Sequence, residues 1–479
     1  MRSQIIIAGL ALTSTALLVG HMNTDAVAAR GSGGVVAPDV IVGSLPGISR
    51  YGVVNGIAAY AVGTTSCNIG NDFLLWEGNN NNHPTIGQNM YRVDQLDNGC
   101  SRIEHIGMSW LKHGFCALQG TLCGSCSNPA PGGCPPILGW NCSDPYSSGL
   151  NGSQSGLGPK SEVNASTGYF PYPYSSPSYP ATIGRRLNVF STDMDMATYP
   201  SSSSNYFVEG QYIHPQDAAA CKSYNNASYR EVTRSGSLSS GYNLNLINST
   251  RQMTPAVYAW QEIDPDVDIQ IFELSKCQIS GLNESFHVGV KVCELDNGMW
   301  HYEYAVYNQD CDDAFQSFEL PLNGTFENAE QAFAVYHSNE VYANESWDVG
   351  YNSSNSTLQW SSDTFAENPE ANALRWNTTH TFSFDTSDPP VLGEATLTTF
   401  KTGTEVTIDI VVPNASAGPG CLGDINSDNV VDGQDLAIVL AFWGNNDEGD
   451  LDDDGQTSGT DLAIVLADWG CNSQLNGGL

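Results

Sequence analysis

The sequence predicts a mainly β, sandwich-like large region that is stapled by disulfides, followed by a small α-helical module. The composition favours strands, because 48 glycines and 21 tyrosines accompany only 14% charged residues in a chain of 479 residues. Such a chain has few of the Glu, Lys and Arg side chains that form exposed helix faces. The other two observations are 13 cysteines and many short apolar runs that end at turn residues.

The charge of the chain excludes one class of partner. Its 17 Lys and Arg residues stand against 52 Asp and Glu residues, which gives a formal net charge of -35. A surface this acidic repels phosphate backbones, so we expect no nucleic-acid binding.

Residues 1–29 are typical of a signal peptide. Arg2 supplies a positive charge, residues 5–20 are mostly apolar, and residues 26–28 (Ala-Val-Ala) fit a small-x-small cleavage site. No later stretch approaches the roughly 18 apolar residues that a membrane-spanning helix needs. We therefore expect a protein that is secreted, extracellular or at the cell surface, and not embedded in a membrane.

The cysteines of the mature chain are expected to form disulfides, because export leads to an oxidising compartment. Five of them crowd into residues 116–142, among Gly-Ser, Asn-Pro and Pro-Gly-Gly sequences that are typical of loops. A zinc knuckle is the alternative, since the Cys-x-x-Cys spacing of Cys123 and Cys126 does not exclude it. The odd total leaves one thiol unpaired or joined to another molecule.

Two β regions follow the signal peptide. Residues 30–280 form a β-rich, cysteine-containing region with short strand-like runs such as 57–62 and 73–76. Residues 281–412 form a sandwich-like region with a cleaner alternation, in which Trp300, Tyr302 and Tyr304 face one way and His301 and Glu303 face the other. The sequence leaves open whether the two regions are one domain or two. Residues 413–420 form a linker by composition.

Two pairs of side chains are the catalytic candidates of the large region. His301 and Glu303 share a strand face at a spacing of roughly 7 Å, which suits acid–base work or part of a metal site. The alternative is the polar outer face of a sandwich strand. Asp193 and Asp195 could supply the paired carboxylates of a glycoside hydrolase, which needs two at ~5–9 Å. The chain contains no Gly-x-Ser-x-Gly, P-loop or His-Glu-x-x-His sequence.

Two further groups deserve a structural test. Glu104, His105 and His113 form the first cluster that a metal or acid–base hypothesis would select. A Pro- and Tyr-rich stretch could offer flat faces for sugar rings, through Tyr169, Phe170, Tyr172, Tyr174 and Tyr179.

The tail, residues 421–471, contains two segments that repeat with a period of 26 residues. Each is a twelve-residue loop with oxygen-bearing side chains at positions 1, 3, 5 and 12, a pattern that wraps a hard cation of Ca²⁺ size. In the first loop, positions 1, 3, 5, 7, 9 and 12 are Asp424, Asn426, Asp428, Val430, Asp432 and Asp435. In the second they are Asp450, Asp452, Asp454, Gln456, Ser458 and Asp461. The spacing therefore predicts two Ca²⁺ ions.

Each loop leads into a predicted helix with one apolar stripe. We expect the two stripes to bury each other; they consist of Leu436, Val439, Leu440 and Trp443, and of Leu462, Val465, Leu466 and Trp469. Cys421 and Cys471 could clasp the ends of the module. Residues 421–471 contain 12 Asp and Glu and no Lys or Arg, so metal binding is expected to be coupled to folding.

These repeats resemble the duplicated calcium loop–helix segments of dockerin domains, type I in character, and end in a similar Ala-x-Trp-Gly phrase. The resemblance covers about 50 of 479 residues. It implies an EF-hand-like fold and a cohesin-type partner, and hosts of this module are often polysaccharide-degrading enzymes. In the large region, residues 106–115 and 158–164 resemble uncharacterised secreted proteins of the planctomycete kind, which implies no activity.

We therefore expect a secreted protein whose tail attaches it, in a calcium-dependent way, to a cohesin-type or cell-surface partner. Its large region would act on or bind polysaccharide. An enzyme of this kind would be a polysaccharide-degrading glycoside hydrolase or lyase. The alternative is a non-catalytic glycan-binding or surface structural protein.

Overall fold

The computed structural model describes residues 36–130, 132–274, 284–413, 423, 425–426, 430–445, 449–451, 456–467 and 469. The predicted signal peptide at residues 1–29, residues 414–420 of the predicted linker, and the tail at 472–479 lie outside the described residues.

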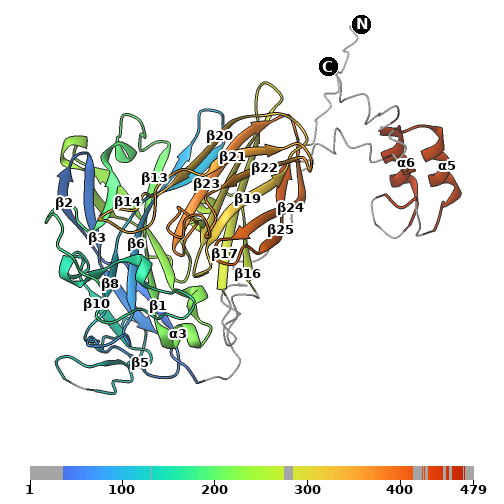
Figure 1. The fold of residues 1–479 in the computed structure, drawn as a ribbon. Helices are drawn as coiled ribbons and strands as arrows, with labels where there is room; N and C mark the ends of the chain where they lie inside the picture. Colours follow the sequence, from blue (N-terminus) through green and yellow to red (C-terminus); the bar gives the residue numbers. More distant parts are fainter. Residues whose placement is uncertain are drawn as a thin grey trace, which may run out of the picture. The chain divides into compact units, whose positions relative to one another are not determined.

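The prediction of a mainly β fold is confirmed (Figure 1). The described α-helices before residue 413 are short, as expected from the scarcity of good helix formers. They are α2 (Ser148–Asn151), α3 (Pro215–Ala219) and α4 (Tyr258–Ile263). None of the helices in the described part of the chain has the length and apolarity needed to cross a membrane.

The first region is built on one large sheet with the strand order β15-β14-β13-β6-β7-β12-β3-β2, to which β8 and β11 attach beside β6. Asn55 and Gly56 both have positive φ angles, of 52° and 79°, which suits the tight hairpin between β2 and β3. The strands are β2 (Ile48–Val54), β3 (Ile57–Val62), β6 (Thr85–Gln95), β7 (Ser101–Met108), β8 (Leu111–His113), β11 (Leu157–Gly158), β12 (Leu187–Phe190), β13 (Ser204–Ile213), β14 (Ala227–Ser235) and β15 (Asn243–Leu246).

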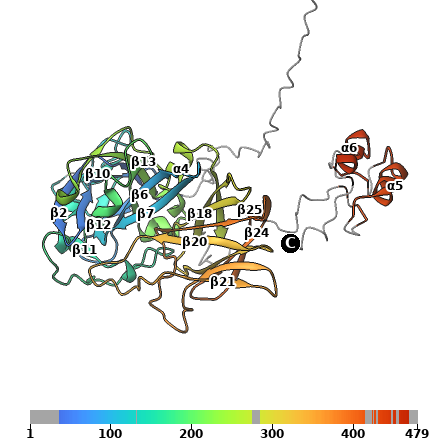
Figure 2. The same ribbon diagram turned by 90° about the horizontal axis from the view of Figure 1, so that it is seen from above.

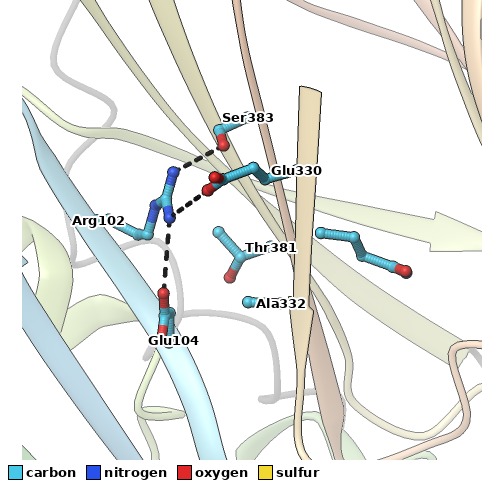
Figure 3. Close-up of a pocket in the computed structure, with 7 residues that line it drawn as sticks. Arg102, Glu104, Glu330, Ala332, Thr381 and Ser383 are labelled. Atoms are coloured by element: carbon cyan, nitrogen blue, oxygen red, sulfur yellow. Dashed lines mark hydrogen bonds and ion pairs between the residues drawn. The ribbon is translucent and has the colours of Figure 1, made fainter. Parts of the chain in front are cut away.

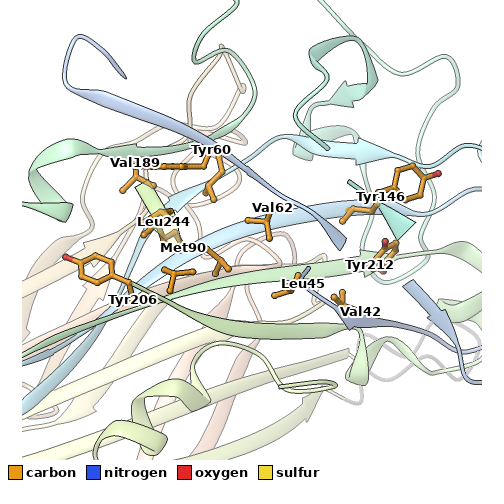
Figure 4. Close-up of a cluster of buried hydrophobic side chains, with 14 of the residues drawn as sticks. Val42, Leu45, Tyr60, Val62, Met90, Tyr146, Val189, Tyr206, Tyr212 and Leu244 are labelled. Carbon is orange, nitrogen blue, oxygen red and sulfur yellow. The ribbon is translucent and has the colours of Figure 1, made fainter. Parts of the chain in front are cut away.

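A three-stranded edge sheet covers part of the large sheet. It has the order β1-β4-β10, with β1 (Val40–Ser44), β4 (Thr64–Asn68) and β10 (Ser143–Tyr146), and a small ladder pairs β5 (Leu74–Leu75) with β9 (Ile137–Leu138). Buried apolar side chains fill the space between the two sheets, including Val42, Tyr60, Met90 and Tyr212 (Figure 4). The Tyr60 hydroxyl donates to the Tyr242 carbonyl at 2.7 Å, so this buried phenol is satisfied.

The second region is a β-sandwich of two five-stranded antiparallel sheets. The inner sheet has the order β16-β17-β18-β23-β20, with β16 (Asp268–Leu274), β17 (Glu284–Glu294), β18 (Trp300–Asn308), β20 (Phe326–Phe333) and β23 (Thr378–Thr386). The outer sheet has the order β21-β22-β19-β24-β25, with β19 (Phe315–Pro321), β21 (Asp348–Asn352), β22 (Thr357–Ser361), β24 (Pro390–Thr399) and β25 (Glu405–Pro413). The sandwich thus includes β16 and begins at Asp268.

The predicted alternation along residues 300–307 is confirmed. Tyr302 and Tyr304 lie in the aromatic core between the inner and outer sheets, together with Trp360. Ala305 and Tyr307 point the other way, into a second apolar cluster with Trp260 and side chains of the large sheet. Both faces of the inner sheet are therefore covered, because β7 of the large sheet lies beside β18 and β20 (Figure 2) and also contacts β23.

The expectation of disulfides is confirmed, and the zinc-knuckle alternative is wrong. Cys123 bonds to Cys67 of β4, whereas Cys126 bonds to Cys142, just before β10, so the two cysteines do not share a metal site. The described bonds are Cys67–Cys123, Cys100–Cys293, Cys116–Cys134 and Cys126–Cys142. Cys100–Cys293 joins the large sheet to β17 of the inner sheet. The predicted Cys421–Cys471 clasp lies outside the described residues.

The C-terminal module contains two nine-residue helices, α5 (Gly433–Ala441) and α6 (Gly459–Ala467). Asp432 caps α5: its carboxylate accepts the backbone N–H of Gln434 at 2.7 Å. The side chain of Asp435 accepts the backbone N–H of Asp432 in return, which completes a capping box.

Candidate functional site

A row of polar side chains crosses the inner sheet. Glu330 of β20 lies opposite Ser383 of β23, and Ser383 lies opposite Glu303 of β18. Alternation along β18 puts His301 on the same face as Glu303, and the residue opposite His301 is Asp385. The antiparallel register therefore gathers four titratable groups from distant parts of the sequence.

His301 bridges two carboxylates in this row. Its Nε2 lies 2.8 Å from Glu303 Oε1, and its Nδ1 lies 2.5 Å from Asp385 Oδ1. Asn328 donates to the other oxygen of Asp385 at 2.6 Å. Burial opposes the charged imidazolium, but the hydrogen bonds and charges of Glu303 and Asp385 outweigh it and raise the pKa of His301. His301 is therefore suited to carry a proton between the two carboxylates.

The interpretation of His301 and Glu303 as a polar outer face is wrong. Glu303 is 0% exposed and His301 is 7% exposed, because the large sheet covers this face. Arg102 of β7 donates its Nε–H between the two carboxylate oxygens of Glu303, with Nε–O distances of 2.8 and 3.0 Å. The structure thus brings this predicted pair together, but inside a buried ion-pair network.

Arg102 extends from Glu303 into a cavity of about 280 Å³ (Figure 3). Its Nη2 donates to Ser383 Oγ at 2.7 Å, and its Nη1 donates to Glu330 Oε2 at 3.1 Å. The same Nη1 lies 3.7 Å from Glu104 Oε1. Two carboxylates therefore converge on one guanidinium nitrogen at the wall of the cavity.

The cavity lies where one edge of β7 is open. β12 pairs with β7 only at Gly107 and Met108, so residues 101–106 have no strand neighbour on that side within the described chain. Thr381 of β23 takes the place of a strand partner for this part of β7, because its hydroxyl donates to the Ile103 carbonyl at 2.6 Å. Ala332 lies opposite Thr381 in the register and completes this wall.

A second guanidinium extends the network away from the cavity. Arg92 Nη2 lies 2.5 Å from Glu104 Oε2, and Arg92 Nε lies 2.5 Å from Asp94 Oδ2. Arg92 Nη1 also donates to the main-chain carbonyl of Asp193 at 3.1 Å. A chain of alternating charges thus runs from the inner sheet, through Arg102, to the loop that follows β12.

The predicted pair Asp193 and Asp195 have different neighbours. Burial raises the pKa of Asp193 to about 6, and the positive charge of Arg92 opposes this shift. Asp195 Oδ1 accepts instead from the Tyr242 hydroxyl at 3.4 Å and from the backbone N–H of Ala197 at 3.1 Å. Among the described contacts, Asp193 is linked to the Arg92–Glu104–Arg102 network, and Asp195 is not.

The hypothetical cluster of Glu104, His105 and His113 does not form. Successive residues of β7 point to opposite faces, so His105 stacks on Tyr91 with ring centroids 4.7 Å apart, away from Glu104. His113 lies on β8, where its Nδ1 is 3.0 Å from Nε2 of His83. The aromatic stretch is divided as well: Tyr169 and Tyr172 are exposed, whereas Phe170 is buried and Tyr174 stacks on His113.

Sequence reasoning missed Arg102 and Glu330, which line the cavity. One signal was available for Arg102, since it is one of only 17 Lys and Arg residues and alternates with Glu104 in a strand-like run. Glu330 has no such signal, because the apolar spacing of residues 328–335 resembles a helix more than a strand. The structure makes Phe326–Phe333 the strand β20.

In the C-terminal module, the residue at position 12 of the first loop folds back onto the loop. Asp435 Oδ1 accepts the backbone N–H groups of Ile425 and Asn426 at 2.9 and 3.2 Å. Its Oδ2 accepts the backbone N–H of Asp432 at 2.9 Å. Asp435 is 0% exposed, so this carboxylate is held inside the loop.

The second loop repeats this arrangement. Asp461 Oδ1 accepts the backbone N–H of Leu451 at 2.6 Å, and Oδ2 accepts that of Ser458 at 2.6 Å. These donors occupy the same loop positions as Ile425 and Asp432. Asp461 is also 0% exposed, so the sequence repeat corresponds to a repeated structure.

The predicted calcium ligands fall into two groups. The described part includes Asn426, Val430, Asp432, Asp435, Asp450, Gln456, Ser458 and Asp461, whereas Asp424, Asp428, Asp452 and Asp454 lie outside the described residues. Within the described residues, no group of three or more His, Cys, Asp or Glu side chains is arranged to hold a metal ion. The calcium sites stay a prediction.

The expected burial of the two helical stripes is only half correct. Val439 and Val465 are buried against each other and against Val431. Leu436 and Leu462 are partly buried against the same cluster. The remaining members of the stripes are exposed, at 57% for Leu440, 48% for Trp443, 54% for Leu466 and 51% for Trp469. The reason is that loop residues complete the small core, and both tryptophans follow the ends of their helices.

Comparisons with known proteins identify no family for this chain. No family model and no curated protein matches it. Among solved structures, it is similar in part to a GH20 exo-β-N-acetylglucosaminidase from Vibrio harveyi in complex with N-acetylglucosamine. The identity is 9%, the match covers 30% of this chain and 17% of that chain, and the TM-score is 0.16. A likeness at this level carries no argument about fold or activity.

Proposed function

We propose that this chain is a secreted protein that its C-terminal module attaches, in a calcium-dependent way, to a cohesin-type or cell-surface partner. The observation that carries the proposal is the repeated inward fold of Asp435 and Asp461, each fully buried at the twelfth position of its loop. Burial of a carboxylate is costly unless its charge is compensated. Residues 421–471 contain no Lys or Arg, so a bound cation suits this place.

The donor chemistry of the module fits Ca²⁺. The described candidates are carboxylates, an amide, a hydroxyl and main-chain carbonyls, all of them oxygen ligands of the kind that Ca²⁺ takes. When bound, the ion would supply the positive charge that the module lacks. Asp435 and Asp461 would then hold the start of each loop against its helix through the backbone hydrogen bonds of Ile425 and Leu451.

The exposed half of the helical stripes supports a role in attachment. Leu440 and Trp443 of the first repeat match Leu466 and Trp469 of the second, and all four are about half exposed. Large apolar side chains that remain at the surface of a small module commonly mark a protein interaction site. The module would therefore offer a partner the same apolar group twice.

For the large region, we propose binding to polysaccharide. Tyr169 is 58% exposed and Tyr172 is 44% exposed, so both rings are accessible for stacking on sugar faces. A non-catalytic role is favoured over glycoside hydrolysis or lysis, because Glu303 is fully buried and bound to Arg102. A catalytic carboxylate has to reach the scissile bond of a polymer.

The calcium proposal is tested on the mature chain, residues 30–479. Titration calorimetry with CaCl₂ after chelation should give two binding events, accompanied by a gain in the helical circular-dichroism signal. The double variant Asp435→Asn and Asp461→Asn should lose both. Absence of binding at millimolar calcium, or binding that the double variant retains, would refute it.

The polysaccharide proposal has a separate test. The same chain is incubated with a panel of insoluble plant and algal polysaccharides, and both retention and soluble products are measured. Retention without products supports the binding role. Products that disappear when one carboxylate is replaced would make the large region an enzyme, and no retention on any glycan would remove the proposal.

A further inference from the structure

The cavity beside Arg102 has the size of a small-ligand site. Its volume is about 280 Å³, just below the range of roughly 300–1,000 Å³ that small-molecule sites occupy. Its polar lining includes Arg102 and Glu104 of the large sheet and Glu330, Thr381 and Ser383 of the inner sheet. This volume fits one ring-sized group rather than an extended chain.

The charges at the cavity wall select against ions. The guanidinium of Arg102 lies between the carboxylates of Glu104 and Glu330, within 3.7 and 3.1 Å of their nearest oxygens. A metal cation that approached the carboxylates would meet the guanidinium, and an anion that approached the guanidinium would meet the two carboxylates. A neutral ligand meets neither repulsion.

The hydrogen-bonding groups of the wall include both donors and acceptors. Arg102 has five N–H groups, of which three are engaged with Glu303, Glu330 and Ser383 in the described structure. Each carboxylate has about four acceptor positions, and Glu330 uses one on Arg102. Ser383 accepts from Arg102 and keeps its own proton to donate. A ligand hydroxyl both donates and accepts, so a ring with several adjacent hydroxyls satisfies such a wall.

The wall is held in place before any ligand arrives. Arg102 is fixed by the fully buried Glu303, and Glu303 is fixed in turn by His301 at 2.8 Å. Glu104 is held from the other side by Arg92 at 2.5 Å. Binding groups that are already ordered lose less conformational entropy when a ligand is bound.

We infer that this cavity binds a single neutral, hydroxyl-rich ring, a sugar residue at the end of a glycan or in a side branch. The inference rests on the proposed polysaccharide function and names a site for it. Arg102, Glu104 and Glu330 would make the polar contacts, and Ala332 would lie against the ring.

The test uses the mature chain, residues 30–479, and calorimetric titration with five neutral sugars: D-glucose, D-galactose, D-mannose, D-xylose and L-fucose. D-glucuronate and D-glucosamine serve as an anionic and a cationic counterpart. We expect at least one neutral sugar to bind, and to bind more tightly than both charged sugars. The substitution Glu330→Ala should weaken that binding by about tenfold, because it removes a charged hydrogen-bond acceptor.

A matched control lies on the same strand. Glu327 is also an exposed carboxylate of β20 but does not line the cavity, so Glu327→Ala should bind the sugar as the native chain does. The substitution Ala332→Phe should abolish binding by filling the cavity, with thermal unfolding as the check that the chain is folded.

Three results would overturn the inference: none of the neutral sugars binds, a charged sugar binds more tightly, or Glu330→Ala and Ala332→Phe bind like the native chain. Retention on insoluble polysaccharide separates the two proposals. Retention that both variants keep would leave the polysaccharide function standing without this cavity, whereas no retention by the native chain would remove both.

Discussion

Arg102 Nε lies 2.8 Å from Glu303 Oε1, although the two residues are 201 positions apart in the chain. The first lies on β7 of the large sheet and the second on β18 of the sandwich. Glu303 is fully buried, and the guanidinium of Arg102 is the charge that compensates it from the facing sheet. The contact therefore joins the two β regions through a desolvated ion pair.

Removal of one partner of this pair should be costly. In Glu303→Gln, Arg102 and His301 lose the carboxylate that lies between them. We expect a loss of about 3 kcal/mol in the free energy of unfolding, as for other broken buried pairs. Urea unfolding at pH 7, followed by tryptophan fluorescence, measures this loss.

The control for that prediction is an exposed pair of the same chemistry. Arg251 Nε lies 2.6 Å from Glu262 Oε1, and both side chains are well exposed at 46% and 39%. Glu262→Gln should cost less than about 1 kcal/mol, because water replaces the lost contact. Equal effects of the two substitutions would contradict a special role for the buried pair.

The disulfide Cys100–Cys293 reinforces the same junction. It spans 193 residues, whereas Cys116–Cys134 spans 18. The longer closed loop restricts the unfolded chain more, so replacing both members of Cys100–Cys293 with Ala should cost roughly 4–5 kcal/mol, against about 3 for Cys116–Cys134. Guanidinium unfolding of the two double-Ala variants measures both values. A larger loss for the shorter loop would contradict the entropic explanation.

Local pattern was enough to predict much of the fold. Alternation along 300–307 assigned Tyr302 and Glu303 to opposite faces correctly, since strand geometry depends only on neighbouring residues. The disulfide-rich loop was likewise recognisable from its turn residues and cysteines. The strand β20 was not recognisable in this way, because the polar pattern from Asn328 to Phe333 is irregular. A bulge in the pairing of β20 with β23, between Glu327 and Glu330, explains this irregularity.

The candidate site could be predicted only in part, because it depends on contacts between sheets. His301 and Glu303 were found from their spacing on one strand. Their burial depends on the large sheet, whose Arg102 pairs with Glu303 from about 200 residues earlier in the chain, and nothing local marks that partner. Glu330 is brought to the cavity by the register of β20 against β23, which is likewise a long-range property.

The stability of the chain should depend on pH through Asp193. Burial raises its pKa from 3.8 to about 6, so the native state holds this proton more tightly than the unfolded state does. The stabilisation from this group is complete below about pH 4 and is lost as the pH rises through 6. Asp193→Asn stays neutral throughout. Between pH 4 and pH 7 the variant should therefore gain about 2 kcal/mol relative to the native chain, as measured by urea unfolding at both pH values. Parallel pH profiles would contradict the raised pKa.

Calcium affinity should depend on the small core of the C-terminal module more than on its exposed side chains. Val465 is 0% exposed in contact with Val431 and Val439, whereas its neighbour Leu466 is 54% exposed. Val465→Ala removes buried methyl groups and should cost the folded module roughly 2 kcal/mol. Because folding and metal binding are expected to be coupled, calcium affinity should fall about tenfold or more.

Leu466→Ala removes more atoms but little buried surface, so its calcium affinity should stay near that of the native chain. Calorimetry on residues 30–479 compares the two variants, and an equal loss of affinity in both would show that the module does not fold around calcium in this way.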